Sequence, residues 1–432
     1  MKIVIENIRS FANHHEYEVR PLTILVGENS SGKSTFLAAL AAVSDSVSFP
    51  GVAALNKSPY DLGTFDTIAT FKGGRGGRAK AFSLGYRVES KGKEKEPLGV
   101  IATFCSDDGD ARVKKLDLTA GNVEVNLVWE KEKIAVRVKG LQDNETLDSS
   151  FLIGQHPAGM TFSSLLSFLP SVVLNPHRAE KFTGTSFEIF KKLDEVAGQW
   201  RETAPRATSI APIRSEPKRT YDRMSDEYYP SGDHVPYVLA RLLLQGEAGK
   251  GKKLHDALVA FGRDSGLFRG INVNRLGSKT GDPFQVQVTV GGPSVNLSDV
   301  GYGVSQSLPI IVESILRATN ARILLQQPEV HLHPKAQAAL GSFFSQLVAQ
   351  EHRQFVIETH SDYLIDRVRQ EVAAGTLRPE AVSILFFDRP HIETTVSELT
   401  LDRYGNIENA PENYRTFFLE EELRLLARAE GE

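Results

Sequence analysis

The residues best suited to chemistry form a glycine-rich segment near the start of the chain. Residues 27–35 read Gly-Glu-Asn-Ser-Ser-Gly-Lys-Ser-Thr, which matches the phosphate-binding pattern G-x-x-x-x-G-K-[ST] at every position. Glycines let the backbone turn so that its N–H groups face phosphate oxygens, and the N-terminus of a following helix adds a favourable dipole. Lys33 is expected to reach the β- and γ-phosphates, and the hydroxyl of Ser34 to bind Mg²⁺. The expected nucleotide-binding residues are Gly27, Glu28, Asn29, Ser30, Ser31, Gly32, Lys33, Ser34 and Thr35.

The elements on either side of this loop have the order that a phosphate loop requires. The stretch Leu22–Val26 is apolar and reads as a strand, while apolar residues from about Lys33 to Val43 recur at helical spacing. A strand that enters the loop and a helix that leaves it make a chance glycine-rich turn the weaker interpretation.

Two later strands end in polar residues that can complete such a site. The apolar stretch Arg322–Gln326 is followed by Gln327, Pro328 and Glu329, and the stretch Gln354–Glu358 is followed by Thr359, His360 and Ser361. A nucleotide-binding fold needs a second strand end that handles Mg²⁺ and water, and a histidine just beyond a buried strand is placed to touch a γ-phosphate. Taken alone, His360 is also compatible with an ordinary packed or surface histidine.

A third motif, Leu297–Gln306, lies upstream of these strands and reads Leu-Ser-Asp-Val-Gly-Tyr-Gly-Val-Ser-Gln. Gly301 and Gly303 permit a close approach of the backbone, and Ser305 falls near the N-terminus of the next predicted helix, where anions bind well. The alternative is a plain loop. The nearby pair His331 and His333 is a weak metal motif, because no acidic or cysteine partner accompanies it.

In this order, the four motifs resemble those of ABC-type ATPases of the OLD-like predicted-ATPase group. These are relatives of the SMC and recombination-repair ATPase heads, and many belong to prokaryotic phage-defence systems. Three further segments are similar to elements of the group, and residues 85–205 are the part that the resemblance supports least. These segments are Tyr60–Phe65, Ile213–Arg219 and Gly405–Ile407.

The resemblance implies a mechanism in which two copies meet head-to-tail around two ATP molecules. The region of Gly303 and Ser305 in one copy would close over the γ-phosphate held by Lys33 of the other, with His360 as the switch histidine. The implied cofactors are ATP and Mg²⁺. The implied assembly is a homodimer or a higher homo-oligomer with ATP at its interface.

One departure from the family pattern affects catalysis. Family members usually carry an acid at the position of Gln326, where it binds Mg²⁺ through water, and often a second acid at Gln327. Glutamine orients water but is a very poor base. Either Glu329 takes over, or hydrolysis is slow and ATP acts mainly as a clamp, and Glu358 is a further candidate because it ends the neighbouring strand.

The expected fold class is α/β, an ABC-type P-loop ATPase head with mixed sheets and an insertion between the phosphate loop and the Leu297–Gln306 motif. Residues 1–80 and 284–432 form the split ATPase domain, and residues 81–283 form the insertion, β-rich in its first half and helical in its second. The length of 432 residues allows about three domains. Lys33 and Glu329 must nevertheless meet one nucleotide, which favours one interrupted domain.

Composition excludes several classes of protein. Hydrophobic residues make up 41% and charged residues 24%, as is ordinary for a globular chain. No apolar stretch reaches the roughly 18 residues that span a bilayer, so no membrane partner is expected. The single cysteine, Cys105, excludes an internal disulfide. A cytoplasmic protein is expected.

Two functions in different classes compete. The first is an ATP-dependent regulator or sensor for a separate effector such as a nuclease, in anti-phage defence; the 72 residues after His360 are too few for the nuclease module fused in full-length OLD proteins. The alternative is a DNA-engaging repair or recombination ATPase, which would bind DNA in a salt-dependent way. A transporter subunit is disfavoured by the long insertion. Nucleic acid stays a possible partner, although solvated loops are the preferred interpretation of the basic residues Arg75, Arg78, Lys80, Arg214, Lys218, Arg219 and Arg223.

Overall fold

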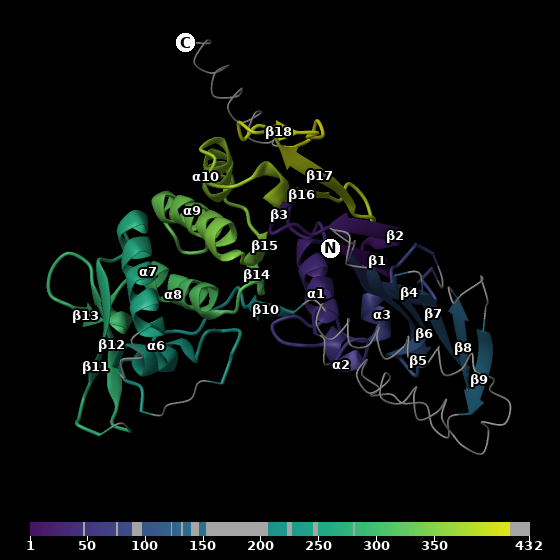
Figure 1. Ribbon diagram of the computed structural model, residues 1–432, viewed down its shortest axis with the longest axis horizontal. Coiled ribbons are helices and arrows are strands. Elements are labelled where there is room, and N and C mark those ends of the chain that lie inside the picture. The colour runs from purple at the N-terminus through teal and green to yellow at the C-terminus, as the bar shows by residue number, and fades with distance from the viewer. Residues whose placement is uncertain are drawn as a thin grey trace, which may run out of the picture.

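The computed structural model describes most of the chain, and its strands form three sheets. The described residues are 1–45, 48–74, 77–88, 97–121, 123–130, 133–139, 147–152, 206–222, 227–244, 249–279 and 281–414. Within them, a mostly parallel central sheet, a larger antiparallel outer sheet and a small antiparallel sheet combine with helices into a mixed α/β fold (Figure 1). The predicted helices at residues 179–202 and 417–429 lie outside the described residues.

The central sheet positions the candidate site. Its strand order is β10-β14-β15-β3-β16-β17-β18; the first five strands are parallel to their neighbours, and the last two are antiparallel. Parallel strands place their carboxyl ends at one edge of a sheet, where α/β proteins bind ligands. The strands are β3 (Leu22–Gly27), β10 (Ala207–Ile210), β14 (Arg322–Gln326), β15 (Gln354–Glu358), β16 (Val382–Asp388), β17 (Thr395–Leu401) and β18 (Ile407–Glu408).

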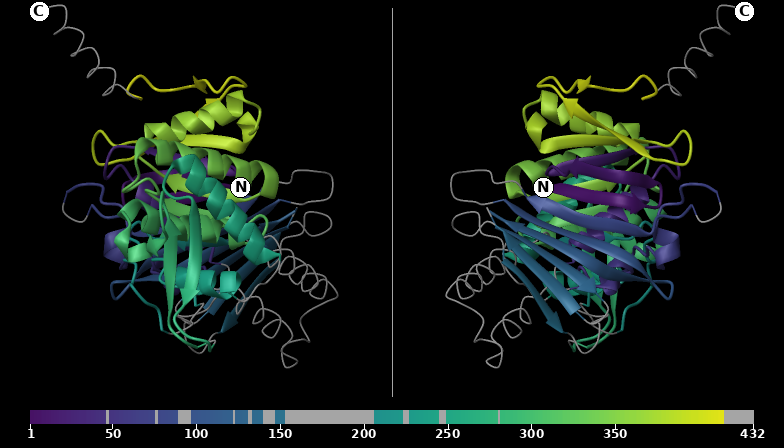
Figure 2. Two further views of the ribbon diagram at one scale, coloured as in Figure 1. Left: turned by 90° about the vertical axis from the view of Figure 1, so that its left-hand side faces the viewer. Right: turned by 90° about the vertical axis from the view of Figure 1, so that its right-hand side faces the viewer.

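The outer sheet has the order β2-β1-β4-β5-β6-β7-β8-β9, and every pair in it is antiparallel. Figure 2 shows its purple and blue strands side by side on one flank of the molecule. Its strands are β1 (Lys2–Ile8), β2 (Phe11–Glu18), β4 (Ala81–Val88), β5 (Leu98–Asp107), β6 (Asp110–Ala120), β7 (Val123–Glu130), β8 (Lys133–Lys139) and β9 (Leu147–Leu152). The small sheet comprises β11 (Gly270–Arg275), β12 (Phe284–Thr289) and β13 (Val295–Asn296).

Helices cover both faces of the central sheet. Helix α1 lies on the side of the outer sheet, and α7 to α10 lie on the other side (Figure 1). The helices are α1 (Lys33–Val43), α2 (Val52–Leu55), α3 (Phe65–Ile68), α6 (Val235–Leu244), α7 (Lys250–Ser265), α8 (Tyr302–Leu316), α9 (Pro334–Glu351) and α10 (Asp362–Ala373). Two 3-10 turns, η3 (Leu297–Asp299) and η4 (Pro379–Ala381), complete the set.

The buried side chains of the central sheet divide between two hydrophobic cores. Leu324 and Leu25 belong to the core shared with α1 and the outer sheet, whereas Ile323 and Ile24 belong to the core shared with α8, α9 and α10. This alternation follows from strand geometry, because successive side chains point to opposite faces. Both faces are covered, so these strands read as nearly continuous apolar runs.

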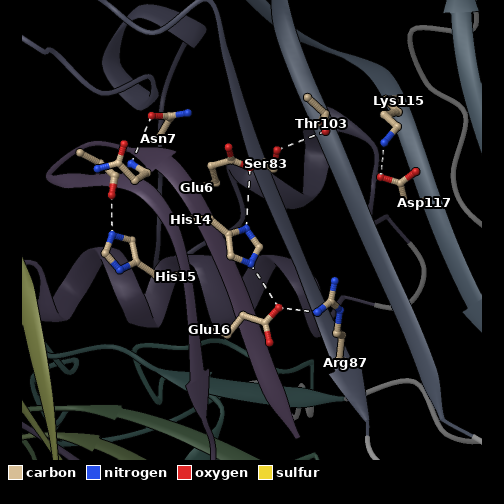
Figure 3. A network of polar contacts seen from close by, with 12 residues as sticks. Glu6, Asn7, His14, His15, Glu16, Ser83, Arg87, Thr103, Lys115 and Asp117 are labelled. Atoms are coloured by element: carbon tan, nitrogen blue, oxygen red, sulfur yellow. Dashed lines mark hydrogen bonds and ion pairs between the residues drawn. The ribbon is translucent and has the colours of Figure 1, made fainter.

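The outer sheet carries polar pairs within and between its strands, which Figure 3 shows. Glu16 accepts from His14 at 3.2 Å and pairs with Arg87 at 2.5 Å, and Lys115 pairs with Asp117 at 2.7 Å. Exposed ion pairs of this kind contribute about 0–1 kcal/mol each. These pairs therefore add little to the stability of the sheet.

The element predictions near the phosphate loop are confirmed, and the domain division stays a prediction. Helix α1 and strands β14 and β15 have the predicted bounds, and β3 extends one residue further, to Gly27. Strands β1 and β4 pair across the predicted boundary at residue 80, and β11 and β12 pair across that at residue 283. The segment 81–283 thus shares sheets with the rest of the chain. No helix among the described residues has the length and apolar character to cross a membrane.

Candidate nucleotide-binding site

The phosphate loop connects the end of β3 to α1, and two glycines make its path possible. Gly27 has φ of 138°, and a Cβ there would lie 2.1 Å from the carbonyl oxygen of Phe387 on β16. Gly32 has φ of 111° and stands directly before α1. Other residues rarely adopt these backbone angles, so glycine is required at both positions.

Lys33 begins α1 and is buried against the loop. Its Nζ donates to the carbonyl oxygens of Gly27 at 2.8 Å and Glu28 at 2.6 Å. Burial lowers the pKa of Lys33, while the negative charges of Glu358 and Glu28 act in the opposite direction. The ammonium group therefore stands inside the curve of the loop, where a phosphate would meet it.

Polar side chains from two strand ends meet Ser34. The Oγ of Ser34 donates toward both carboxylate oxygens of Glu358, at 3.1 and 3.0 Å, and the Nε2 of Gln326 donates to the same Oγ at 2.8 Å. Gln326 and Glu358 end β14 and β15 and are register partners. Burial raises the pKa of Glu358, and the hydrogen bond from Ser34 and the charge of Lys33 offset part of this effect.

These residues line a cavity of about 690 Å³, which is large enough for a nucleotide. Sequence reasoning missed two of its arginines: the Nη1 of Arg9 donates to the Oγ1 of Thr35 at 3.4 Å, and that of Arg389 to the carbonyl oxygen of Ser30 at 3.2 Å. No sequence motif indicates Arg9 and Arg389, because both come from loops outside the motifs. The lining residues are Arg9, Ser10, Asn29, Ser30, Gly32, Lys33, Ser34, Thr35, Thr67, Ala69, Phe71, Arg78, Gln326, Gln327, Glu358, Arg389 and Ile392.

Glu329 and His360 form a second group behind the strand ends. The Oε1 of Glu329 accepts from the backbone N–H of His360 at 2.7 Å, while its buried Oε2 has no hydrogen-bond partner. Burial raises the pKa of Glu329, and partial burial together with the charge of Lys33 lowers that of His360. Neither residue is among those that line the cavity.

Arg214 is the other charged residue of this second group. Its side chain is 4% exposed, its Nη2 donates to the carbonyl oxygen of Gln327 at 3.4 Å, and its Nε and Nη1 have no hydrogen-bond partner. Burial lowers the pKa of Arg214 to about 10, and the attraction of Glu329 opposes the shift. The sequence marked Arg214 only as part of a basic cluster.

The basic residues named from the sequence differ in exposure, and Arg78, Lys80, Lys218 and Arg219 are exposed. Arg214 is buried, Arg219 forms an ion pair of 2.5 Å with Asp299, and Arg78 donates to the carbonyl oxygen of Ala69 at 2.9 Å. Arg75 and Arg223 lie outside the described residues. The preference for solvated loops over a nucleic-acid surface stays a prediction.

The motif at Leu297–Gln306 lies apart from the cavity of its own chain. Ser305 is in the first turn of α8, where its Oγ donates to the carbonyl oxygen of Tyr302 at 3.0 Å. A Cβ at Gly303 would approach the carbonyl oxygen of His331 to 3.0 Å, so this glycine serves close packing. Ser305 lines a different cavity, of about 280 Å³.

His331 and His333 take structural positions. The ring of His331 packs at 5.9 Å against that of Tyr302, and the Nδ1 of His333 accepts from the backbone N–H of Lys335 at the start of α9. The described residues contain no group of three or more His, Cys, Asp or Glu side chains that could hold a metal ion by itself.

The donor set at the cavity fits ATP with magnesium. Backbone N–H groups at a helix N-terminus and the Lys33 ammonium suit phosphate, and the oxygen atoms of Ser34 and Glu358 are the hard ligands that Mg²⁺ takes. A mixed α/β fold with a phosphate loop at the carboxyl edge of its central sheet defines the class as a P-loop ATPase.

Comparison with known proteins agrees with this class, because two models of AAA-type ATPase domains match the sequence. The model described as "AAA domain" matches residues 2–150, and the model described as "AAA ATPase domain" matches residues 182–365. The first match contains the phosphate loop, and the second contains β14 and β15. No curated protein matches the chain.

Solved structures of SMC heads are among those to which the chain is similar, at low sequence identity. An SMC head bound to the C-terminal winged-helix domain of ScpA is 12% identical with a TM-score of 0.43, covering 93% of this chain and 98% of its own. The Smc head of Pyrococcus furiosus, bound to the C-terminal domain of ScpA, is 10% identical with a TM-score of 0.41, covering 99% and 98%. The SMC head of Thermotoga maritima is 11% identical with a TM-score of 0.35, covering 92% and 97%.

Proposed function

We propose that this chain binds ATP with Mg²⁺ in the cavity at the phosphate loop and hydrolyses it slowly. The observation that carries the proposal is the meeting of Lys33, Ser34 and Glu358 at the carboxyl edge of the central sheet. Lys33 holds the β- and γ-phosphates, the backbone of residues 27–32 cradles them, and Ser34 and Gln326 stand on the metal side. Bound Mg²⁺ supplies positive charge that offsets charge developing on the phosphates.

Slow turnover is expected because the side chains proposed to face the γ-phosphate include no efficient base. Gln327 lines the cavity and can orient water, but its amide accepts no proton. Glu329 follows Gln327 by two residues, and its Oε1 accepts from the backbone N–H of His360. In this proposal Glu329 acts from behind the cavity by holding the backbone of His360, the residue that the resemblance assigns to the γ-phosphate.

The proposal includes assembly around the nucleotide. Gly303 and Ser305 lie away from the cavity of their own chain, which supports a head-to-tail homodimer, or a higher homo-oligomer, where they reach a partner's ATP. Sedimentation velocity with and without ATP tests this assembly, since a monomer under both conditions contradicts it. Residues 1–80 and 284–432 form the ATPase unit in this proposal, and residues 81–283 the insertion.

The resemblance to OLD-like ATPases supports a role as a regulator or sensor for a separate effector, such as a nuclease, in anti-phage defence. Infection of cells that express the chain with its neighbouring genes, compared with cells that carry Lys33→Ala, tests this role. Equal phage growth in both contradicts it.

The nucleotide site itself is tested with Lys33→Ala. Loss of the ammonium should weaken ATP binding by about 100-fold, equivalent to about 2.7 kcal/mol, because charge-assisted contacts to phosphate are lost. Isothermal titration calorimetry measures the affinity, and far-UV circular dichroism checks that the fold is kept. The matched control is Lys253→Ala, which removes an exposed lysine of α7 that pairs with Glu351. Normal ATP binding by Lys33→Ala would refute the site.

A further inference from the structure

We propose that Glu358 supplies the metal-side carboxylate of this site, in place of the acid that position 326 lacks. The assignment rests on the proposed function and moves a metal ligand from β14 to the neighbouring strand β15. It makes Glu358 a ligand to Mg²⁺ or to its bound water, whereas the sequence analysis names it only as a candidate catalytic residue.

The first argument is the position of the carboxylate relative to Ser34. Both oxygens of Glu358 lie within hydrogen-bond distance of the Ser34 Oγ, at 3.1 and 3.0 Å. The phosphate-loop hydroxyl is the expected Mg²⁺ ligand. A carboxylate that touches this hydroxyl is placed to share the same ion.

The second argument is strand register. Gln326 and Glu358 are register partners on parallel strands, and partners of this kind point to the same face of the sheet. Neighbouring strands are about 4.8 Å apart, a span that a glutamate side chain covers. An acid moved from β14 to β15 at this position therefore still reaches Ser34. The amide of Gln326 confirms the convergence, since its Nε2 donates to the same Oγ at 2.8 Å.

The third argument is charge. Among the described residues that line the cavity, Glu358 is the one carboxylate, while Arg9, Lys33, Arg78 and Arg389 are cationic. Glutamine brings no charge to Mg²⁺. Glu329 lies outside the lining, and one of its oxygens is bound to the backbone of His360. Glu358 is therefore the negatively charged protein ligand that Mg²⁺ favours.

The test measures how strongly Mg²⁺ improves nucleotide binding, independently of turnover. A fluorescent ATP analogue is titrated into wild type and Glu358→Gln, with Mg²⁺ and with EDTA. We expect wild type to bind more tightly with Mg²⁺, and Glu358→Gln to lose about 10-fold or more of that gain while its affinity in EDTA changes little. The matched control is Glu398→Gln on β17, a carboxylate outside the cavity lining. It should keep the full effect of Mg²⁺.

A swap of the two side chains makes the test specific. The double variant Gln326→Glu with Glu358→Gln should recover the Mg²⁺ effect, because the acid returns to the neighbouring strand within reach of Ser34. If Glu358→Gln fails to fold, Glu358→Asp replaces it and should show a partial loss. An undiminished Mg²⁺ effect in Glu358→Gln, or in Glu358→Asp where that replaces it, overturns this assignment alone. No binding of the analogue by wild type overturns the nucleotide site as well.

Discussion

Glu313 in α8 and Glu358 in β15 are equally buried, at 4% exposed each, but their surroundings differ. The Oε1 of Glu313 is 2.8 Å from the Nε2 of His234, and its Oε2 accepts from the Nε of Arg317 at 2.6 Å. Burial would raise the pKa of Glu313, yet the hydrogen bonds and charges of His234 and Arg317 hold it below its usual value. The aromatic ring of Tyr228 covers Arg317 at 4.6 Å.

The carboxylates of the nucleotide site have neighbouring cations, Lys33 for Glu358 and Arg214 for Glu329, whose charge offsets only part of the effect of burial. Glu358 contacts the neutral groups of Ser34 and Gln326, and Glu329 has an oxygen without a hydrogen-bond partner. Burial raises the pKa of both acids, and two nitrogens of the nearby Arg214 are also unpaired.

The contrast separates two uses of buried charge. A carboxylate whose charged form is fully paired contributes to the native fold, whereas one that is disfavoured by burial and incompletely paired marks a functional site. The Glu313 cluster joins the segment before α6 to α8. The carboxyl groups of Glu329 and Glu358 remain available to interact with a ligand.

The largest effect should come from neutralising the fully paired carboxylate. Glu313→Gln removes the charge that the hydrogen bonds from His234 and Arg317 favour, and breaking a buried charge pair costs about 3–5 kcal/mol. We expect the free energy of unfolding to fall by about 3 kcal/mol, measured by urea denaturation. ATP affinity of the folded variant should match wild type, because Glu313 does not line the cavity. Unchanged stability would remove the contrast between the two regions.

Glu329→Gln is expected to change the free energy of unfolding less than Glu313→Gln does. Because burial disfavours the charged form of Glu329, the neutral amide should leave the free energy of unfolding within about 1 kcal/mol of wild type. ATP turnover should fall by about 10-fold or more, since a group that acts in proton transfer or holds His360 is altered. The measurements are urea denaturation and phosphate release. Fast turnover that Glu329→Gln does not change would remove Glu329 from the mechanism.

The sequence could predict the features that have a local signal. Local pattern was sufficient for β3, the phosphate loop and α1, because spacing of apolar residues and two obligatory glycines define them. The polar ends of β14 and β15 were also found, since a buried strand that ends in polar residues is a local signal. Their convergence on Ser34 follows from parallel pairing, which a single sequence leaves implicit.

Features that depend on distant contacts were missed. Strand β10 joins the edge of the central sheet through four residues, and β17 adds to the other side in antiparallel orientation. Arg9 and Arg389 reach the cavity from loops far apart in the sequence. The sequence analysis treats Arg214 as a surface charge, but the structure buries it near Glu329. No spacing rule predicts burial of that kind.

The smallest expected effect, and the sharpest test of the contrast, is the pH dependence of the free energy of unfolding of the two variants. Glu313 has a lowered pKa in the folded state, so its charge stabilises the fold above the unfolded pKa of about 4.5 and this contribution is lost as pH falls through the folded pKa. Glu329 has a raised pKa, so its cost to the fold appears as pH rises above about 4.5. Urea denaturation between about pH 3 and 8 should therefore show the deficit of Glu313→Gln narrowing as pH falls below about 4.5. Glu329→Gln should gain on wild type toward neutral pH, and parallel profiles for the two variants would mean that both carboxylates serve the fold in the same way.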